Sequence, residues 1–140
     1  MKLGFKKLSQ NARLPEYVHE GDSGMDVRSV EYRVIHPGGH ALVKTGLAAD
    51  IPEGHEIQVR PRSGLSAKYG IQCAWGTVDC GYKGEICVNL FNYGCEAYEV
   101  KVGDKIAQFV LAPVTRAEVV EVADVGTSER GDGGFGSTGK

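Results

Sequence analysis

The chain has 140 residues and a mass of 15.0 kDa, with 16 basic and 18 acidic side chains and a net charge of −2. A chain of this length forms one domain with a sizeable core. It has no basic surplus to neutralise phosphates, so nucleic-acid binding is not expected. Its apolar stretches are only a few residues long and none follows the lysines near the start, so neither a membrane span nor a signal peptide is expected.

The four cysteines form no C-x-x-C pair, and their spacing matches no zinc-binding pattern. Without an export signal they are expected to be reduced thiols, which predicts a cytoplasmic location. They are Cys73, Cys80, Cys87 and Cys95.

Short alternating apolar runs separated by glycine and proline clusters predict an all-β sandwich or barrel. The first clear run, 56–60, places Ile57 and Val59 on one face, and residues 63–69 are the only helical segment. Alternation returns over 86–91 and 106–111, where Gln108 shares a face with Ile106, and β-branched residues predict a strand over 119–122. Turn clusters lie at 37–39, 52–54, 92–94 and 102–104.

The composition changes after Val125. Residues 126–140 contain six glycines, and Phe135 is their only large apolar side chain. Such a segment cannot order itself, so we expect a domain over 1–125 and a flexible arm over 126–140. It is either a bare tail or an arm in which Arg130 binds an anion and Phe135 stacks on a flat ring. The G-x-x-x-x-G-K match at 134–140 lacks the following Ser or Thr and helix of a P-loop.

Five clusters combine polar residues and glycine more densely than a plain sandwich requires. Taken singly, Asp26 fits a solvated carboxylate in a bulge and Ser63 fits the N-cap of the short helix. Gln108 is either a satisfied structural amide or a ligand contact. The clusters are Ser23-Gly24-Met25-Asp26, Pro61-Arg62-Ser63-Gly64-Leu65-Ser66, Gly76-Thr77-Val78-Asp79-Cys80-Gly81-Tyr82, Gly103-Asp104-Lys105-Ile106-Ala107-Gln108 and the segment 130–139.

In this order and at these separations, the clusters resemble the five motifs of the trimeric deoxyuridine triphosphate nucleotidohydrolases (dUTPases), over nearly the whole chain from Ser23 to Gly139. The most specific stretch is 130–139. The resemblance implies a jelly-roll-like β-barrel and hydrolysis of dUTP to dUMP and pyrophosphate by a water that attacks the α-phosphorus. That reaction keeps uracil out of DNA and supplies dUMP for thymidylate synthesis.

The resemblance also implies a role for each site residue. Asp79 aligns with the aspartate that activates the water, a role that suits a general base. Without the rest of the motif, an aspartate that closes a hairpin turn before Gly81 would be the leading interpretation. The hairpin 76–82 aligns with the uracil pocket, where backbone groups mimic a base-pairing edge and the Tyr82 ring packs under the deoxyribose. The pocket contacts implied are Gly76, Thr77, Val78 and Tyr82.

Phosphate contacts are implied at the start of the short helix, where amides and the helix dipole favour an anion. Gln108 would contact the α-phosphate, and the arm would bind the γ-phosphate and stack on uracil. Mg²⁺ would be held mainly by the triphosphate, with Asp26 contacting it through water. The active sites would lie between the subunits of a homotrimer. The implied phosphate and arm contacts are Arg62, Ser63, Gly64, Gln108, Arg130, Phe135, Gly136 and Ser137.

The sequence departs from the common family pattern at two positions, where Gly81 replaces an aspartate and Cys73 replaces an asparagine. Backbone contacts must then carry more of the uracil recognition, and Trp75, just before Gly76, is expected to pack beside the hairpin. Three alternatives differ in class. A dCTP deaminase of the same fold would need a glutamate where Asn89 stands. A nucleotide-binding regulator would not need the full set of motifs, and a plain β-sandwich adhesion or coat module would need none.

Overall fold

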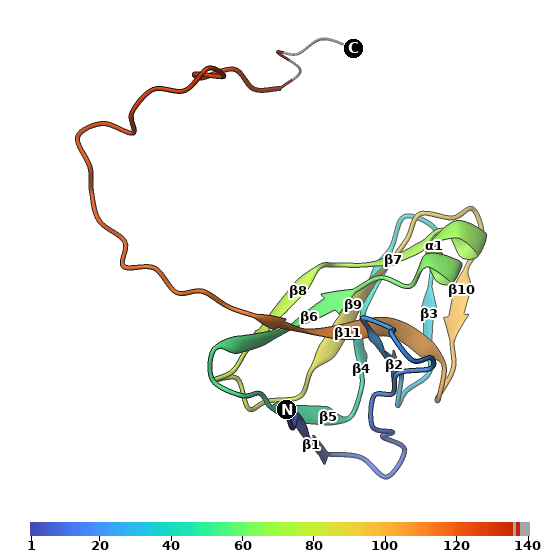
Figure 1. Ribbon diagram of the computed structural model, residues 1–140. Helices are drawn as coiled ribbons and strands as arrows, with labels where there is room; N and C mark the ends of the chain where they lie inside the picture. The colour runs from blue at the N-terminus through green and yellow to red at the C-terminus, as the bar shows by residue number, and fades with distance from the viewer. Residues whose placement is uncertain (136, 138–140) are drawn as a thin grey trace.

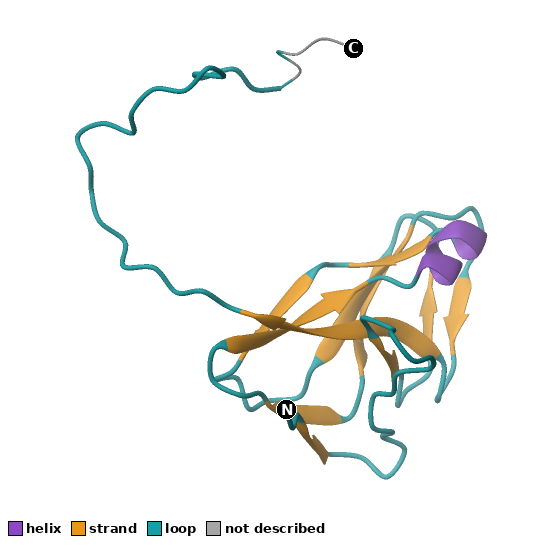
Figure 2. Ribbon diagram, in the orientation of Figure 1, coloured by secondary structure: helices purple, strands orange, loops and turns teal. Residues whose placement is uncertain are grey.

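The structure, a computed structural model, describes residues 1–135 and 137. It is built almost entirely of antiparallel strands, with a short helix at one end (Figures 1 and 2). The elements are β1 (Gly4–Lys7), β2 (Met25–Arg28), β3 (Arg33–Ile35), β4 (His40–Lys44), β5 (Leu47–Asp50), β6 (His55–Arg60), α1 (Ser63–Tyr69), β7 (Ile71–Cys73), β8 (Gly76–Asp79), β9 (Cys87–Asn92), β10 (Tyr98–Val100) and β11 (Lys105–Pro113).

The strands form small sheets rather than one closed ring of hydrogen bonds within the described residues. The largest has the order β2-β11-β6-β8, and the next has the order β4-β9-β7. Two further pairs join β1 to β5 and β3 to β10. Partners in each sheet are far apart in the sequence, as in a jelly roll. The predicted all-β, jelly-roll-like fold with one short helix is confirmed.

The core lies between these sheets and is filled by the inward residues of each alternating run. Ile57 and Val59 of β6 are buried, as predicted, and so are Val88 and Leu90 of β9. Phe109 at the centre of β11 is fully buried and stacks on Phe5 at a centroid distance of 6.4 Å. Burying a side chain of this size stabilises the fold by about 1.5–3 kcal/mol.

Helix α1 spans Ser63–Tyr69, as the sequence predicted, and packs Leu65 into the core. It ends at Gly70, whose left-handed backbone (φ +69°) lets its amide bond to the carbonyls of Leu65 and Ser66. The residue at the N-cap is Arg62, and no side chain caps the first turn. The interpretation of Ser63 as an ordinary N-cap was therefore wrong.

Strand β11 carries a β-bulge near its start. Lys105 pairs with Arg28 and Ala107 pairs with Val27, so one extra residue lies between them. Ile106 and Ala107 are consequently both buried, and regular alternation begins only at Ala107. The predicted alternation from Ile106 onward was wrong at this point.

After β11 the chain leaves the strand-rich body (Figure 1). The last backbone bond to the body joins the Val114 amide to the Gly54 carbonyl at 2.8 Å. Residues 119–122, predicted as a strand, lie in no strand, and Val119 is 94% exposed. The prediction was wrong because β-branched residues favour a strand only where another strand is available for pairing. Among the described residues, no helix has the length and apolar character that a membrane crossing requires.

Candidate active site

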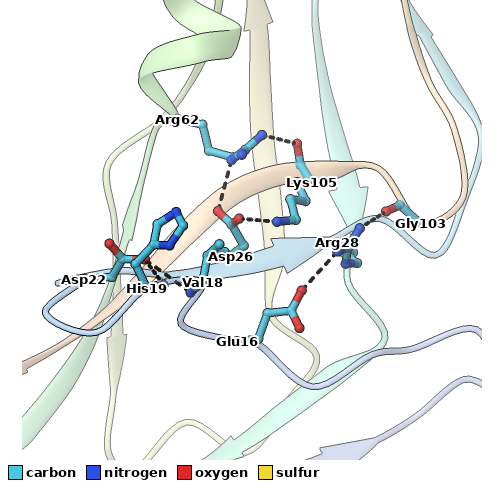
Figure 3. A network of polar contacts seen from close by, with 9 residues as sticks. All are labelled: Glu16, Val18, His19, Asp22, Asp26, Arg28, Arg62, Gly103 and Lys105. Carbon is cyan, nitrogen blue, oxygen red and sulfur yellow. Dashed lines mark hydrogen bonds and ion pairs between the residues drawn. The ribbon is translucent and has the colours of Figure 1, made fainter.

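Charged side chains gather around Asp26 where β2, β11 and the end of β6 meet (Figure 3). Arg62 donates from Nε to Oδ1 of Asp26 at 3.0 Å, and Nζ of Lys105 lies 2.7 Å from Oδ2. Asp26 is only 4% exposed, and a carboxylate this deeply buried requires such partners. The interpretation of Asp26 as a solvated carboxylate in a bulge was therefore wrong.

The two cations determine the protonation state of Asp26. Burial alone raises the pKa of Asp26, but the hydrogen bond from Lys105 and the charges of Arg62 and Lys105 outweigh it, so the pKa lies below its usual value. Asp26 is therefore ionised at neutral pH. The cluster of one carboxylate and two cations retains a net positive charge, which suits the binding of an anion.

Gln108 lies on the same sheet face as Asp26, because the two residues are register partners between β11 and β2. Its side chain is partly exposed. A Cβ atom at Gly24 would lie 3.0 Å from Oε1 of Gln108, so a glycine at position 24 leaves space for the amide. Ser63 and Gly64, next to Arg62 at the start of α1, are exposed. The structure thus brings Asp26, Arg62, Ser63, Gly64 and Gln108 to one edge, which we call the anion edge.

A second group of predicted residues lines a cavity of about 360 Å³ beside β8. Gly76, Thr77, Val78, Asp79 and Tyr82 all contribute to its wall. Among the residues that the structure describes, strand β8 is the outer strand of its sheet and pairs with β6 alone, so its other edge offers amides and carbonyls for a ligand. Such an edge can hydrogen-bond a planar base in the manner of a pairing strand. Sequence reasoning missed Leu42, Glu85 and Cys87, which also line this cavity.

Tyr82 is held beside this cavity by the turn that follows β8. Its amide bonds to the carbonyl of Asp79 at 3.0 Å, and its hydroxyl donates to the carbonyl of Glu85 at 2.9 Å. A Cβ atom at Gly84 would lie 2.6 Å from the Tyr82 hydroxyl, so the ring keeps its place only because residue 84 is glycine.

The structure keeps the cavity and the anion edge apart within one chain. On β6, Glu56 is the register partner of Asp79, whereas Arg60 is the partner of Gln108. Four residues of β6 separate these levels, which is about 13 Å along the strand, and β8 and β11 lie two strand spacings apart, about 10 Å. Asp79 and Gln108 of one chain therefore cannot contact the same phosphorus centre.

The described residues of the predicted arm contact neither group. Nε of Arg130 donates to the carbonyl of Gly133 at 2.7 Å, and the Ser137 amide bonds to the carbonyl of Gly134 at 3.0 Å. Phe135 is fully exposed. Gly136, also predicted to bind substrate, lies outside the described residues.

The residues that depart from the family pattern occupy distinct environments. Cys73 is buried in the hydrophobic core, and burial raises the pKa of its thiol to about 11. Only two residues connect β7 to β8, and one of them, Trp75, is 71% exposed, with the Arg60 guanidinium 5.3 Å from its ring centroid. Gly81 has open space around it.

The donor set fits a metal ion that arrives with a phosphate ligand. Among residues 1–135 and 137, no group of three or more His, Cys, Asp or Glu side chains could hold an ion. Each oxygen of Asp26 already contacts one cation but keeps a further lone pair, so it can accept a hydrogen bond from a metal-bound water rather than bind the ion directly. Such contacts suit Mg²⁺, which gives up its water reluctantly and binds substrate phosphates.

Comparisons with known proteins agree on one family. The family model described as dUTPase matches residues 10–139. The deoxyuridine 5'-triphosphate nucleotidohydrolase of Clostridium tetani is 47% identical over 140 residues, covering 99% of this chain and 97% of that protein. The same-named protein of Nautilia profundicola is 50% identical over 142 residues, covering all of both chains.

Solved structures agree with the sequence comparisons. A variant of the Staphylococcus bacteriophage 80alpha dUTPase with dUpNHpp superposes with a TM-score of 0.93 at 32% identity, covering 99% of each chain. A variant dUTPase from phage phi11 of S. aureus, described as coordinating a structural Mg(II) ion, superposes with a TM-score of 0.85 at 30% identity, covering 91% of this chain and all of that one.

Proposed function

The chain belongs to the dUTPase family and hydrolyses dUTP, and from this premise we propose that Asp79 activates the attacking water. Its carboxylate is exposed at the end of β8, on the wall of the cavity, where it can reach a bound nucleotide. A carboxylate within hydrogen-bond distance of a water acts as a general base while that water attacks phosphorus. Pyrophosphate then leaves and dUMP remains.

The cavity beside β8 is the proposed uracil site. Unpaired amides and carbonyls of β8 present a fixed donor and acceptor order, which accepts uracil and leaves polar groups unpaired with cytosine. Tyr82, held by its turn and by Glu85, forms the floor under the deoxyribose and leaves no space for a 2′-hydroxyl. Cys73 is given no role, because it belongs to the hydrophobic core and its thiol is only a weak hydrogen-bonding group.

We propose that each active site is shared between chains of a homotrimer. The carrying observation is the separation of Asp79 from Gln108, about 13 Å along and 10 Å across the sheet, although both are assigned to the α-phosphate. The anion edge of one chain, placed against the cavity of another, would bring them together. Exposed valines after β11 support association, because Val119, Val120 and Val125 have no cover in the single chain.

The triphosphate would bind at the anion edge through Arg62, Ser63, Gly64 and Gln108. Mg²⁺ would neutralise the phosphate oxygens when bound, and Asp26 would hold one of its waters in place. The positive balance around Asp26 supports this assignment.

The arm is the proposed lid. In its described part, residues 126–135, glycines favour mobility; Arg130 would bind the γ-phosphate and Phe135 the base, and the predicted contacts Gly136 and Ser137 would add polar groups. Closure would exclude bulk water from the α-phosphate. We expect the enzyme in the cytoplasm, since all four cysteines are free thiols.

A panel of nucleoside triphosphates with pyrophosphate and ammonia both measured tests this function. Among these nucleotides, dUTP is expected to be the one that releases pyrophosphate. No ammonia is expected from dCTP, because Asn89 cannot shuttle a proton. Asp79→Asn keeps the volume and can still bind a water but cannot accept its proton, so it should bind dUTP and lose at least about 100-fold in kcat. Near-normal turnover of this variant would remove Asp79 from the mechanism.

A further inference from the structure

Lys105 belongs to a sequence cluster assigned to substrate binding, yet the proposed reaction gives it no role. It is the first residue of β11 and lies three positions before Gln108. Residues three apart on a regular strand face opposite sides of a sheet. The bulge between Lys105 and Ala107 adds one residue, so Lys105 pairs with Arg28 while Gln108 pairs with Asp26. Because positions 26 and 28 share a face, the bulge places Lys105 on the side of the anion edge.

The Lys105 ammonium is committed to Asp26. Nζ lies 2.7 Å from Oδ2, and the side chain is only 25% exposed. The other nearby cation, Arg28, is bound elsewhere, to Glu16 at 3.0 Å and to the Gly103 carbonyl at 2.9 Å (Figure 3). Lys105 is therefore the cation that compensates the second oxygen of Asp26.

The ion pair between Lys105 and Asp26 determines which nitrogens of Arg62 bind Asp26. Arg62 bonds to Asp26 only through Nε, at 3.0 Å, and its Nη1 makes a long contact of 3.5 Å with the Lys105 carbonyl. Within the residues that the structure describes, its Nη2 has no hydrogen-bond partner. A guanidinium beside a carboxylate with an open second oxygen prefers to bind both oxygens side by side. Lys105 competes for that second oxygen, and Arg62 accordingly binds Asp26 through one nitrogen only.

We propose that Lys105 is a positioning residue of the anion edge: by holding the second oxygen of Asp26, it keeps the outer nitrogens of Arg62 available for the triphosphate. This inference rests on the proposed function, because it assumes that Arg62 binds phosphate. Lys105 acts through Asp26 and Arg62 rather than by touching the substrate itself.

Lys105→Met tests the proposal by removing the charge and keeping the length of the side chain. The loss of one charge-assisted contact should lower kcat/KM for dUTP roughly 10- to 100-fold, chiefly through KM. Inhibition by deoxyuridine, which carries no phosphate, should stay unchanged, and Lys105→Arg should restore most of the loss. Lys101→Met is the matched control, because it removes an exposed lysine from the preceding turn.

The same substitution in an Asp26→Asn background separates positioning from direct contact. Without the carboxylate charge, Lys105 has no ion pair at position 26, so Lys105→Met should then lower kcat/KM for dUTP by less than about threefold. An equal loss in both backgrounds would mean that Lys105 touches the phosphates directly, and wild-type KM in Lys105→Met would mean that it has no role; either result overturns the proposal. If Lys105→Met does not fold, Lys105→Ala, which also removes the charge and the donor to Oδ2, replaces it in both backgrounds. A wild-type chain that releases no pyrophosphate from dUTP would instead refute the proposed function.

Discussion

Gly84→Ala should move Tyr82 without deleting it. The new Cβ would lie 2.6 Å from the tyrosine hydroxyl and 2.7 Å from Cζ, whereas ordinary contact begins near 3.4 Å, so the ring must shift by about 0.8 Å. Tyr82 is 48% exposed and can swing outward, at the cost of its bond to the Glu85 carbonyl. Folding stability should therefore change by less than about 1 kcal/mol.

The catalytic effect should be larger, because the ring positions the sugar. A displacement approaching 1 Å in a positioning group lowers kcat/KM by roughly 10- to 100-fold. Pyrophosphate release from dUTP and UTP gives the measurement, and discrimination against UTP should fall. Gly81→Ala is the control, since a Cβ there meets nothing within 4 Å. If Gly84→Ala matched this control in rate and in selectivity, the assignment of Tyr82 to the sugar floor would fail.

Three further predictions concern stability and the arm. The pKa of Asp26 is lower in the folded chain than in the unfolded chain, where it lies near 4. The ion pairs of Asp26 therefore stabilise the fold fully above that unfolded pKa, and this stabilisation is lost as the pH falls through the folded pKa. The difference in unfolding free energy between wild type and Asp26→Asn should stay constant above about pH 5 and shrink below it. Asn92→Ala should lower the unfolding free energy by about 2–4 kcal/mol in urea titrations, because the buried amide donates to the carbonyls of Ile35 and Glu96, both at 2.8 Å. Deleting the chain from Glu129 onward should abolish most of kcat and leave the melting temperature nearly unchanged, and a truncated enzyme with full activity would make this segment a mere tail.

Local patterns in the sequence were sufficient to predict a strand or helix where one face of that element is buried. The alternation over 86–91 and the helix over 63–69 followed from which residues must face the core. The bulge before Ala107 could not be predicted, because it depends on how β11 pairs with a strand some 80 positions earlier. The prediction of a strand over 119–122 failed for the opposite reason: its residues favour a strand, but the part of the single chain that the structure describes offers them no partner strand.

In the candidate site, too, features formed by neighbouring residues could be predicted from the sequence, whereas features formed by distant segments could not. Gly76, Thr77, Val78, Asp79 and Tyr82 are close in the sequence, so their cluster predicted one cavity wall. The ion pair of Asp26 with Lys105 joins segments 79 positions apart and left no local pattern. The distance between Asp79 and Gln108 is likewise a property of sheet order, which sequence spacing does not contain.

The shared active site can be tested by mixing two inactive chains. Asp79→Asn lacks the base but keeps the anion edge, whereas Arg62→Ala lacks a phosphate contact but keeps the cavity. The two variants are co-expressed with different tags and purified through both tags, so that every trimer is mixed. They should together regain about one third of wild-type activity, because each mixed ring of three contains one site whose cavity comes from Arg62→Ala and whose anion edge comes from Asp79→Asn. Mixed oligomers that are no more active than either variant alone would show that each site lies within a single chain.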